Sequence, residues 1–243
     1  MKRVGAFLVC LAPVACSVPS LAEAQRHADL ARVEALVVAG TNEFRRQEHL
    51  GAVAVDGHLE AAAREFAVFM ARTAKFDHDA DGRTPSLRVQ AHGYDFCLVA
   101  ENLAYEYNTA DFETSDLARR LVEGWKASPG HRANMLKADA IDTAVALARV
   151  VAKGAPRYYA VQLFGRPKSA RVQFRVSNPS DTAVRYRVEG REYVAQSRQA
   201  RTHTECGPAP VFFEIAGEAS FTAQGGERFV VRREGGRVSV RRE

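Results

Sequence analysis

Apolar side chains recur at helical spacing through the first half of the chain. They form one stripe between residues 27 and 50, a second between 57 and 74, and a third between 114 and 126. Apolar residues three and four positions apart share one face of a helix, so the pattern predicts three amphipathic helices. We expect Trp125, which closes the third stripe, to anchor the core. The members of the stripes are Leu30, Val33, Leu36, Val37 and Phe44, then Leu59, Ala62, Phe66, Phe69 and Met70, then Leu117, Leu121, Val122 and Trp125.

The periodicity then changes from helical to alternating. Residues 143–151 and 157–164 are rich in Val, Leu and Tyr, and Lys153-Gly154-Ala155-Pro156 separates them. Two such runs joined by a short glycine-containing turn predict a β-hairpin. Helices combined with antiparallel strands favour the α+β class.

Short alternating segments continue beyond Arg166-Pro167-Lys168, with Gly, Pro and Asn residues between them. They predict a small all-β module of about six strands, arranged as a sandwich. We therefore expect two domains, one over residues 25–166 and the other over 167–243. The alternating segments of the second domain include 171–176, 183–188 and 211–215.

The amino terminus has the pattern of a signal peptide. Basic residues precede an apolar run over 4–14 that is too short to span a membrane, and Ala22-Glu23-Ala24 is a typical cleavage site. A lipoprotein signal at Cys16 is the alternative, although Pro13 stands where such signals usually have leucine. We expect residues 1–24 to be removed and the protein to be secreted, either to the periplasm or outside the cell.

The chain that remains holds two cysteines, Cys97 and Cys206. An exported protein meets oxidising conditions, so the two can form a disulfide that ties the halves of the chain together. Two separate buried thiols are the alternative, because free cysteine also packs well in cores. Spacing alone does not decide between them.

Charge is spread unevenly over the two predicted domains. Residues 168–243 contain 14 basic and 9 acidic side chains, whereas residues 25–167 contain 18 basic and 19 acidic ones. A basic module can favour an anionic envelope polymer or a membrane surface as partner. The alternative is that these arginines are simply solvated on strand faces. No nucleic-acid-binding motif and no platform of aromatic and basic residues is present, which argues against a nucleic-acid partner.

Three short turns carry the polar residues that suggest a site. The first is Phe76-Asp77-His78, the second is Ala100-Glu101-Asn102, and the third is Ser128-Pro129-Gly130-His131. Proline and glycine restrict the last turn, so His131 is held by backbone geometry at the start of a helical run.

These segments resemble the CAP superfamily of cysteine-rich secretory proteins, antigen 5 and plant pathogenesis-related proteins of group 1, and above all its bacterial members. The resemblance implies a three-layer α-β-α sandwich for the first domain, with two histidines and acidic residues around a central cleft. The segments that carry it, in the family's order, are Thr41-Asn42-Glu43-Phe44-Arg45, His58-Leu59-Glu60-Ala61-Ala62-Ala63, Phe76-Asp77-His78, Asp81-Gly82-Arg83-Thr84-Pro85, Ala100-Glu101-Asn102-Leu103-Ala104 and Tyr158-Tyr159-Ala160-Val161-Gln162-Leu163-Phe164-Gly165.

The resemblance assigns His78, Glu101 and His131 to the cleft. Asp77 and Asn102 are further candidates, as is Ser128, which stands where the family commonly has its second acid. Imidazole nitrogens are good zinc ligands, so His78 and His131 predict weak zinc binding at most. The alternative is that these groups cap turns and bond to one another, with no ligand.

Two other chemistries have partial patterns. Asp77, Asp79, Asp81 and Gly82 copy half of a calcium-binding EF-hand loop, but Arg88 occupies the position of its bidentate glutamate. A serine hydrolase would need a base and an oxyanion hole around its nucleophile, and no Gly-x-Ser-x-Gly motif is present.

Three functions remain open from the sequence. The first is a non-enzymatic binding protein whose cleft takes a metal or a small hydrophobic ligand or peptide, lipid among them by family resemblance. The second is a metal-assisted hydrolase or protease with Glu101 as base. The third is a cell-envelope protein that docks through the basic β module.

Overall fold

The computed structural model of the chain describes residues 27–217 and 219–243. The predicted signal peptide lies outside the described residues. No helix in the described ranges combines the length and the apolar character that a membrane crossing needs.

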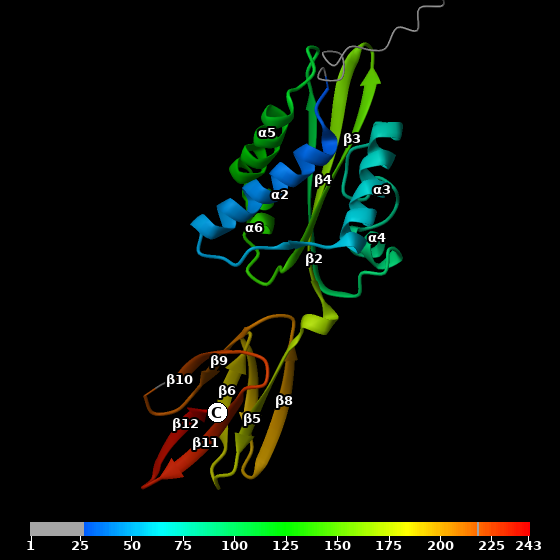
Figure 1. Cartoon of the computed structure of the whole chain (residues 1–243). Coiled ribbons are helices and arrows are strands. Elements are labelled where there is room, and N and C mark those ends of the chain that lie inside the picture. The colour runs from blue at the N-terminus through cyan, green and yellow to red at the C-terminus, as the bar shows by residue number, and fades with distance from the viewer. Residues whose placement is uncertain (1–26, 218) are drawn as a thin grey trace, which may run out of the picture.

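Five helices form in the first part of the described chain (Figure 1). The three predicted stripes become α2, α3 and α5, and each buries its apolar face. Asp29 and Asp56 are the N-cap residues of α2 and α3. Their side chains accept hydrogen bonds from backbone N–H groups in the first turn and so fix where those helices begin. The helices are α2 (Leu30–Gln47), α3 (Gly57–Thr73), α4 (Pro85–Ala91), α5 (Thr114–Ala127) and α6 (Pro129–Met135).

The helices cover a four-stranded sheet. Its strands are β1 (Ala54–Val55), β2 (Phe96–Tyr107), β3 (Asp142–Ala152) and β4 (Ala155–Pro167), in the order β1-β3-β4-β2. β3 and β4 form the predicted hairpin. Its turn is only Lys153-Gly154, both with positive φ, which suits the twist of a two-residue hairpin. The strands are therefore longer than predicted, because Ala155 and Pro156 belong to β4.

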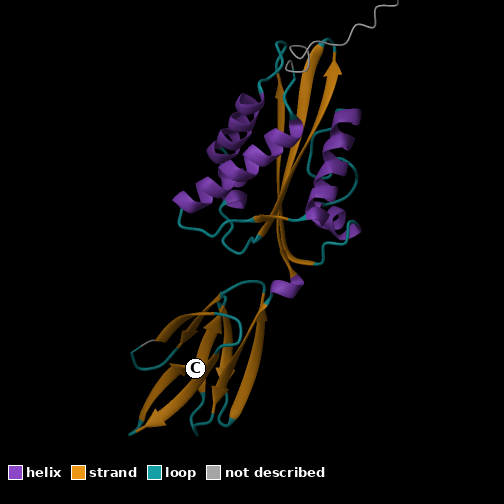
Figure 2. Ribbon diagram, in the orientation of Figure 1, coloured by secondary structure: helices purple, strands orange, loops and turns teal. Residues whose placement is uncertain are grey.

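The sheet has helices on both faces (Figures 1 and 2). One core lies between the sheet and α2, α5 and α6, where Trp125 is 2% exposed and donates to the Leu103 carbonyl. The other core lies between the sheet and α3 and α4. This is the three-layer α-β-α sandwich of an α+β domain, as predicted. β2 is an edge strand, so both helical layers reach it.

The second part is an all-β module of two four-stranded sheets around an apolar core. Its described residues form eight strands, two more than predicted, because short turns divide the alternating segments further. One sheet has the order β10-β9-β6-β7 and the other β12-β11-β5-β8. The strands are β5 (Val172–Asn178), β6 (Val184–Val188), β7 (Arg191–Ala195), β8 (Gln199–Glu205), β9 (Ala209–Phe213), β10 (Ala219–Ala223), β11 (Arg228–Glu234) and β12 (Arg237–Arg242).

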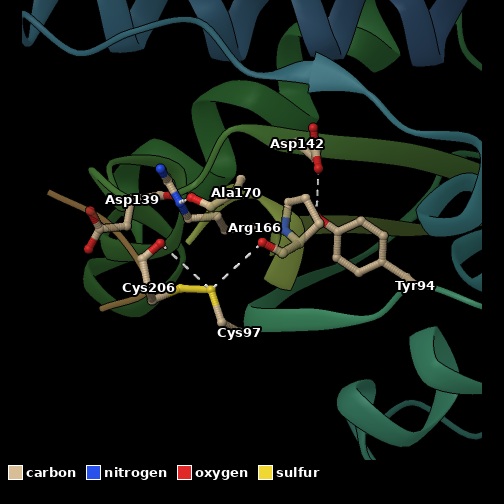
Figure 3. Close-up of a disulfide and its surroundings, with 8 residues drawn as sticks. Tyr94, Cys97, Asp139, Asp142, Arg166, Ala170 and Cys206 are labelled. Atoms are coloured by element: carbon tan, nitrogen blue, oxygen red, sulfur yellow. Dashed lines mark hydrogen bonds between the residues drawn. A yellow bond between two sulfur atoms is a disulfide. The ribbon is translucent and has the colours of Figure 1, made fainter. Parts of the chain in front are cut away.

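A disulfide between Cys97 and Cys206 joins the two parts (Figure 3). Beside it, a Cβ on Gly207 would collide with the Asp139 side chain, so the chains approach each other closely there. The Lys168 backbone N–H also donates to the Asp95 carbonyl at 2.9 Å. The cysteines are 109 residues apart, and closing so long a loop in the unfolded chain is worth about 4 to 5 kcal/mol in the chain-entropy model.

Candidate functional site

His78 lies on the turn that follows α3. The Asp77 carboxylate accepts a hydrogen bond from the His78 backbone N–H at 2.6 Å, so Asp77 caps the turn. The His78 ring bonds through Nδ1 to Oε1 of Glu101 at 2.8 Å. The His78 side chain is 51% exposed, whereas that of Glu101 is 1% exposed. The imidazole therefore faces solvent while its carboxylate partner is buried behind it.

The Glu101 carboxylate has a second partner that the sequence analysis did not foresee. Arg88, on α4, places Nη2 2.8 Å from Oε2 and 3.0 Å from Oε1 of Glu101. Its guanidinium also lies 3.5 Å from the centroid of the Phe66 ring and pairs with Asp81 at 2.9 Å. Both oxygens of Glu101 are thus engaged by Arg88 and His78.

Arg88 also fixes the backbone of the turn. Its guanidinium donates to the carbonyl of His78 at 2.9 Å and to that of Arg83 at 2.7 Å. A single buried cation therefore holds the turn that positions His78 and neutralises the glutamate beneath it. The sequence contained one sign of this role: Thr84 and Pro85 start a helix that puts Arg88 one turn in, opposite Asp81.

His131 lies in the first turn of α6, on the other side of β2. Ser128 is the N-cap residue of α6 and Pro129 follows it, but the Ser128 hydroxyl makes no capping hydrogen bond. Partial burial lowers the pKa of His131, and the nearby charge of His78 lowers it further. The hydrogen bond to Glu101 raises the pKa of His78. The two rings are therefore near enough for the charge of His78 to affect the protonation of His131.

A chain of hydrogen-bonded amides fixes α6 on β2. Asn134 donates to the Asn102 side chain at 2.9 Å and to the Glu101 carbonyl at 3.1 Å, and Asn102 donates to the His131 carbonyl at 3.2 Å. Asn102 is fully buried and faces Gln162 on β4. Asn102 thus positions His131 from within the domain rather than from the solvent side.

The donor set does not fit a metal ion. Among the described residues, no three His, Cys, Asp or Glu side chains are grouped so that they could hold one. Zinc sites use three or four ligands, and here Glu101 is committed to Arg88, which leaves two imidazoles. The half EF-hand does not form a calcium site either, because Asp81 is paired with Arg83 and Arg88.

An aromatic patch that no sequence motif indicated begins next to the His78 turn. Phe76 and Tyr105 have ring centroids 6.2 Å apart, and Tyr105 packs on the buried Tyr159 at 5.1 Å. Phe76 is 47% exposed, Tyr105 38% and Tyr107 61%. Tyr105 and Tyr107 lie four and six residues after Glu101 on β2, and alternate residues of a strand share one face. The patch is therefore on the same face of β2 as Glu101.

Two other histidines have structural partners. His203 is buried in the β module, bonds to the Tyr186 hydroxyl at 2.8 Å and stacks on Phe174. The His58 ring bonds to the His92 carbonyl. Within the described residues no hydrogen bond joins Ser128 to His131, so no serine–histidine dyad forms there.

The first domain matches the family model described as CAP, the cysteine-rich secretory protein family, over residues 38–164. The match covers just over half of the chain, and the chain belongs to this family. An uncharacterized protein of Borreliella burgdorferi is 28% identical over 97 residues, which are 40% of this chain and 57% of that protein. The chain thus spans less than two thirds of that relative's length.

Solved structures with a similar domain come from three bacteria. An outer surface protein of Borrelia burgdorferi has a TM-score of 0.44 at 24% identity, over 54% of this chain and 90% of that one. An extracellular SCP-domain protein of Bacillus anthracis has 0.48 at 23%, over 62% and 45%. A cysteine-rich secretory protein of Staphylococcus aureus has 0.41 at 17%, over 56% and 39%.

Proposed function

We propose that this protein is an exported, non-enzymatic binding protein whose CAP domain contacts its ligand at His78 and the aromatic patch beside it. The observation that carries the proposal is that the Glu101 carboxylate is buried and already bonded to other side chains. Its side chain is 1% exposed, and Arg88 and His78 occupy its two oxygens. A general base must reach the proton it removes, and a buried carboxylate whose two oxygens are already bonded to a guanidinium and an imidazole is inaccessible to a substrate.

The exposed groups suit a ligand that has both a hydrogen-bond acceptor and an apolar part. Glu101 holds Nδ1 of His78, so the opposite edge of the ring, with Nε2, is free to meet a ligand. Because the pKa of His78 is raised, this edge is a hydrogen-bond donor over a wider pH range than that of an ordinary histidine. Phe76 and Tyr105 supply apolar area nearby. We therefore propose a ligand that joins an acceptor, such as a carboxylate, to an apolar part.

An enzymatic function has less support. The hydrolase hypothesis relies on Glu101 as base and on a metal or a serine nucleophile, and the side chains around Glu101 offer neither. The test is to incubate the purified protein with peptide, ester and peptidoglycan substrates. Turnover that disappears in Glu101→Gln would overturn the proposal.

The binding role is tested with decanoate as probe, by following the ring resonances of the histidines and aromatic residues in an NMR titration. We expect shifts at His78, Phe76 and Tyr105, weakened several-fold in His78→Gln and in Phe76→Ser. His58→Gln is the matched control, because His58 is bonded to the His92 carbonyl away from the patch. Decanol should bind more weakly than decanoate, since it lacks the charged acceptor. No shift at these rings, or equal weakening in the control, would contradict the proposal.

A further inference from the structure

The two outer faces of the β module differ in charge. Along each strand, alternate residues point into the core and out to solvent, so strand register defines both faces. The outer face of the sheet β12-β11-β5-β8 carries six arginines, named here the arginine face. They are Arg171, at the start of β5, and Arg175, Arg228, Arg232, Arg237 and Arg241.

Few acids balance the arginine face. Glu243 pairs with Arg228 and Arg232, each at 3.1 Å, and Glu234 lies opposite Arg237 in the register. The other described acidic side chains form no ion pair with Arg171, Arg175, Arg237 or Arg241. The face thus keeps an excess of positive charge, mostly on exposed guanidinium groups.

The opposite sheet, β10-β9-β6-β7, is the internal comparison. Its outer face has two arginines, Arg185 and Arg187, and two glutamates, Glu192 and Glu214. Arg187 lies over the Phe212 ring and 3.7 Å from Glu214. Balanced charges of this kind are enough to keep a sheet face in solution. Solubility alone therefore does not account for the excess on the arginine face.

Most side chains between the arginines are polar, although Val230 lies between Arg228 and Arg232 on this face. Thr202 and Thr204 lie across from Arg175 and Gln173 in the register, and Ser239 lies across from Arg232. Hydroxyl groups beside guanidinium groups suit a partner that offers both anionic groups and sugar hydroxyls. The face has no aromatic side chain on which a base could stack, and no exposed large apolar side chain that could enter a membrane.

We infer that the arginine face binds an anionic polysaccharide. The polymer would lie along the sheet. A hollow of about 510 Å³ beside the junction, lined by Lys168 and Arg171, extends the positive surface past the start of β5. The hollow at the far end of β11 is lined by Arg232 and Arg233 together with Asp181 and Glu234, so it adds no net positive charge. Rows of arginines release the counterions of a polyanion when they bind it, so the binding is salt-dependent. This inference is independent of the ligand proposed for the CAP domain.

The test uses heparin as a model anionic polysaccharide and the full chain with its disulfide intact. We expect binding at low salt that weakens steeply as the salt concentration rises. Arg175→Gln/Arg241→Gln removes two arginines that make no ion pair in the described chain, and should weaken binding roughly tenfold or more. Arg185→Gln/Arg187→Gln removes the same charge from the opposite face and should weaken it by less than about twofold.

Each other outcome is informative. Equal losses in the two double variants would show that net charge alone drives binding, and would overturn the inference. Stronger retention by vesicles of phosphatidylglycerol and phosphatidylcholine, or by single-stranded DNA, than by heparin would replace the polysaccharide with that partner. Arg171→Gln/Arg237→Gln is a second pair on the same face and should reproduce the loss, which guards against a folding defect in the first pair.

Discussion

The CAP domain and the β module differ in how many polar side chains they bury. Among the described residues, the CAP domain buries eight polar or charged side chains, two of them arginines, while the β module buries only Asn178 and His203. Every arginine of the β module keeps at least part of its surface in solvent. The buried residues of the CAP domain are Glu34, Thr41, Arg45, Arg88, Glu101, Asn102, Thr143 and Gln162.

The difference follows from how each part satisfies its backbone. In the β module, ladders between strands use the backbone groups, so side chains are free to alternate between core and solvent. The CAP domain contains irregular segments that need side-chain partners. Arg45 is 1% exposed and donates to four carbonyls, and Arg88 ties down the His78 turn in the same manner. The carbonyls held by Arg45 are those of Gly51, Met135, Lys137 and Ala140.

The largest expected effect comes from removing the buried cation at the site. In Arg88→Met, Glu101 stays buried without its main partner, and Asp81 loses one as well. Breaking a buried ion pair from one side costs about 3 to 5 kcal/mol, because the remaining charge is not compensated. Urea unfolding should show a loss of this size, whereas Arg175→Met on the arginine face should change stability by less than about 0.5 kcal/mol.

A double variant distinguishes loss of the Arg88–Glu101 ion pair from loss of the packing contacts that Arg88 makes. Glu101→Gln removes the charge that Arg88→Met leaves behind, so the double variant should be more stable than Arg88→Met alone. Effects that simply add would show that the two side chains do not compensate each other's charge, and would remove the contrast between the two parts.

Sequence patterns predicted the elements whose side chains follow one period. The stripe from Leu59 to Met70 predicted α3, and the alternation around Phe174 predicted strands of the β module. β2 was not predicted as a strand, because Glu101 and Asn102 interrupt its apolar run while both are in fact buried. Their burial depends on helices from both layers, which lie far away in the sequence.

The motifs identified His78, Glu101 and His131 as candidates, but they did not show which elements would bring partners together. His78 does lie on a turn, whereas the predicted turn at Ala100-Glu101-Asn102 is wrong, because these residues lie within β2. Arg88 was considered only as a residue that opposes calcium, since nothing in the spacing reveals that α4 turns its side chain toward β2. The Cys97–Cys206 bridge could not be decided for the same reason, because it depends on how the two parts meet.

A smaller effect should come from the one buried histidine of the β module. Burial, helped by the charges of Arg201 and Arg191, lowers the pKa of His203 to about 4. Unfolded chains take up this proton near pH 6.5 but the folded module does not, so His203 contributes its full stability above pH 6.5 and loses it as the pH falls toward 4. The loss is on the order of 3 kcal/mol across that window.

Stability measured between pH 4 and pH 7 tests this in two variants. His203→Gln removes the titrating group and should flatten the pH dependence, whatever it does to stability at pH 7. Arg201→Gln removes one of the charges that lower the pKa, and should flatten it less. A pH dependence that is the same in all three proteins would place the acid sensitivity elsewhere in the molecule.

The smallest effect concerns the pair of imidazoles at the site, where only proton affinities should change. His78 and His131 should titrate on opposite sides of 6.5, His78 above it because of Glu101 and His131 below it because of burial and the nearby His78 charge. An NMR titration of the ring protons measures both pKa values. In Glu101→Gln the pKa of His78 should fall, and that of His131 should rise because its neighbour is less often charged.

His78 contributes its stability fully below pH 6.5 and loses it as the pH rises through its raised pKa. Since the ring is half exposed, the change in stability is small. Reversed pKa values, or a His131 value that ignores Glu101→Gln, would mean that the two rings do not share a site, and the ligand proposed for His78 would then have to bind without His131.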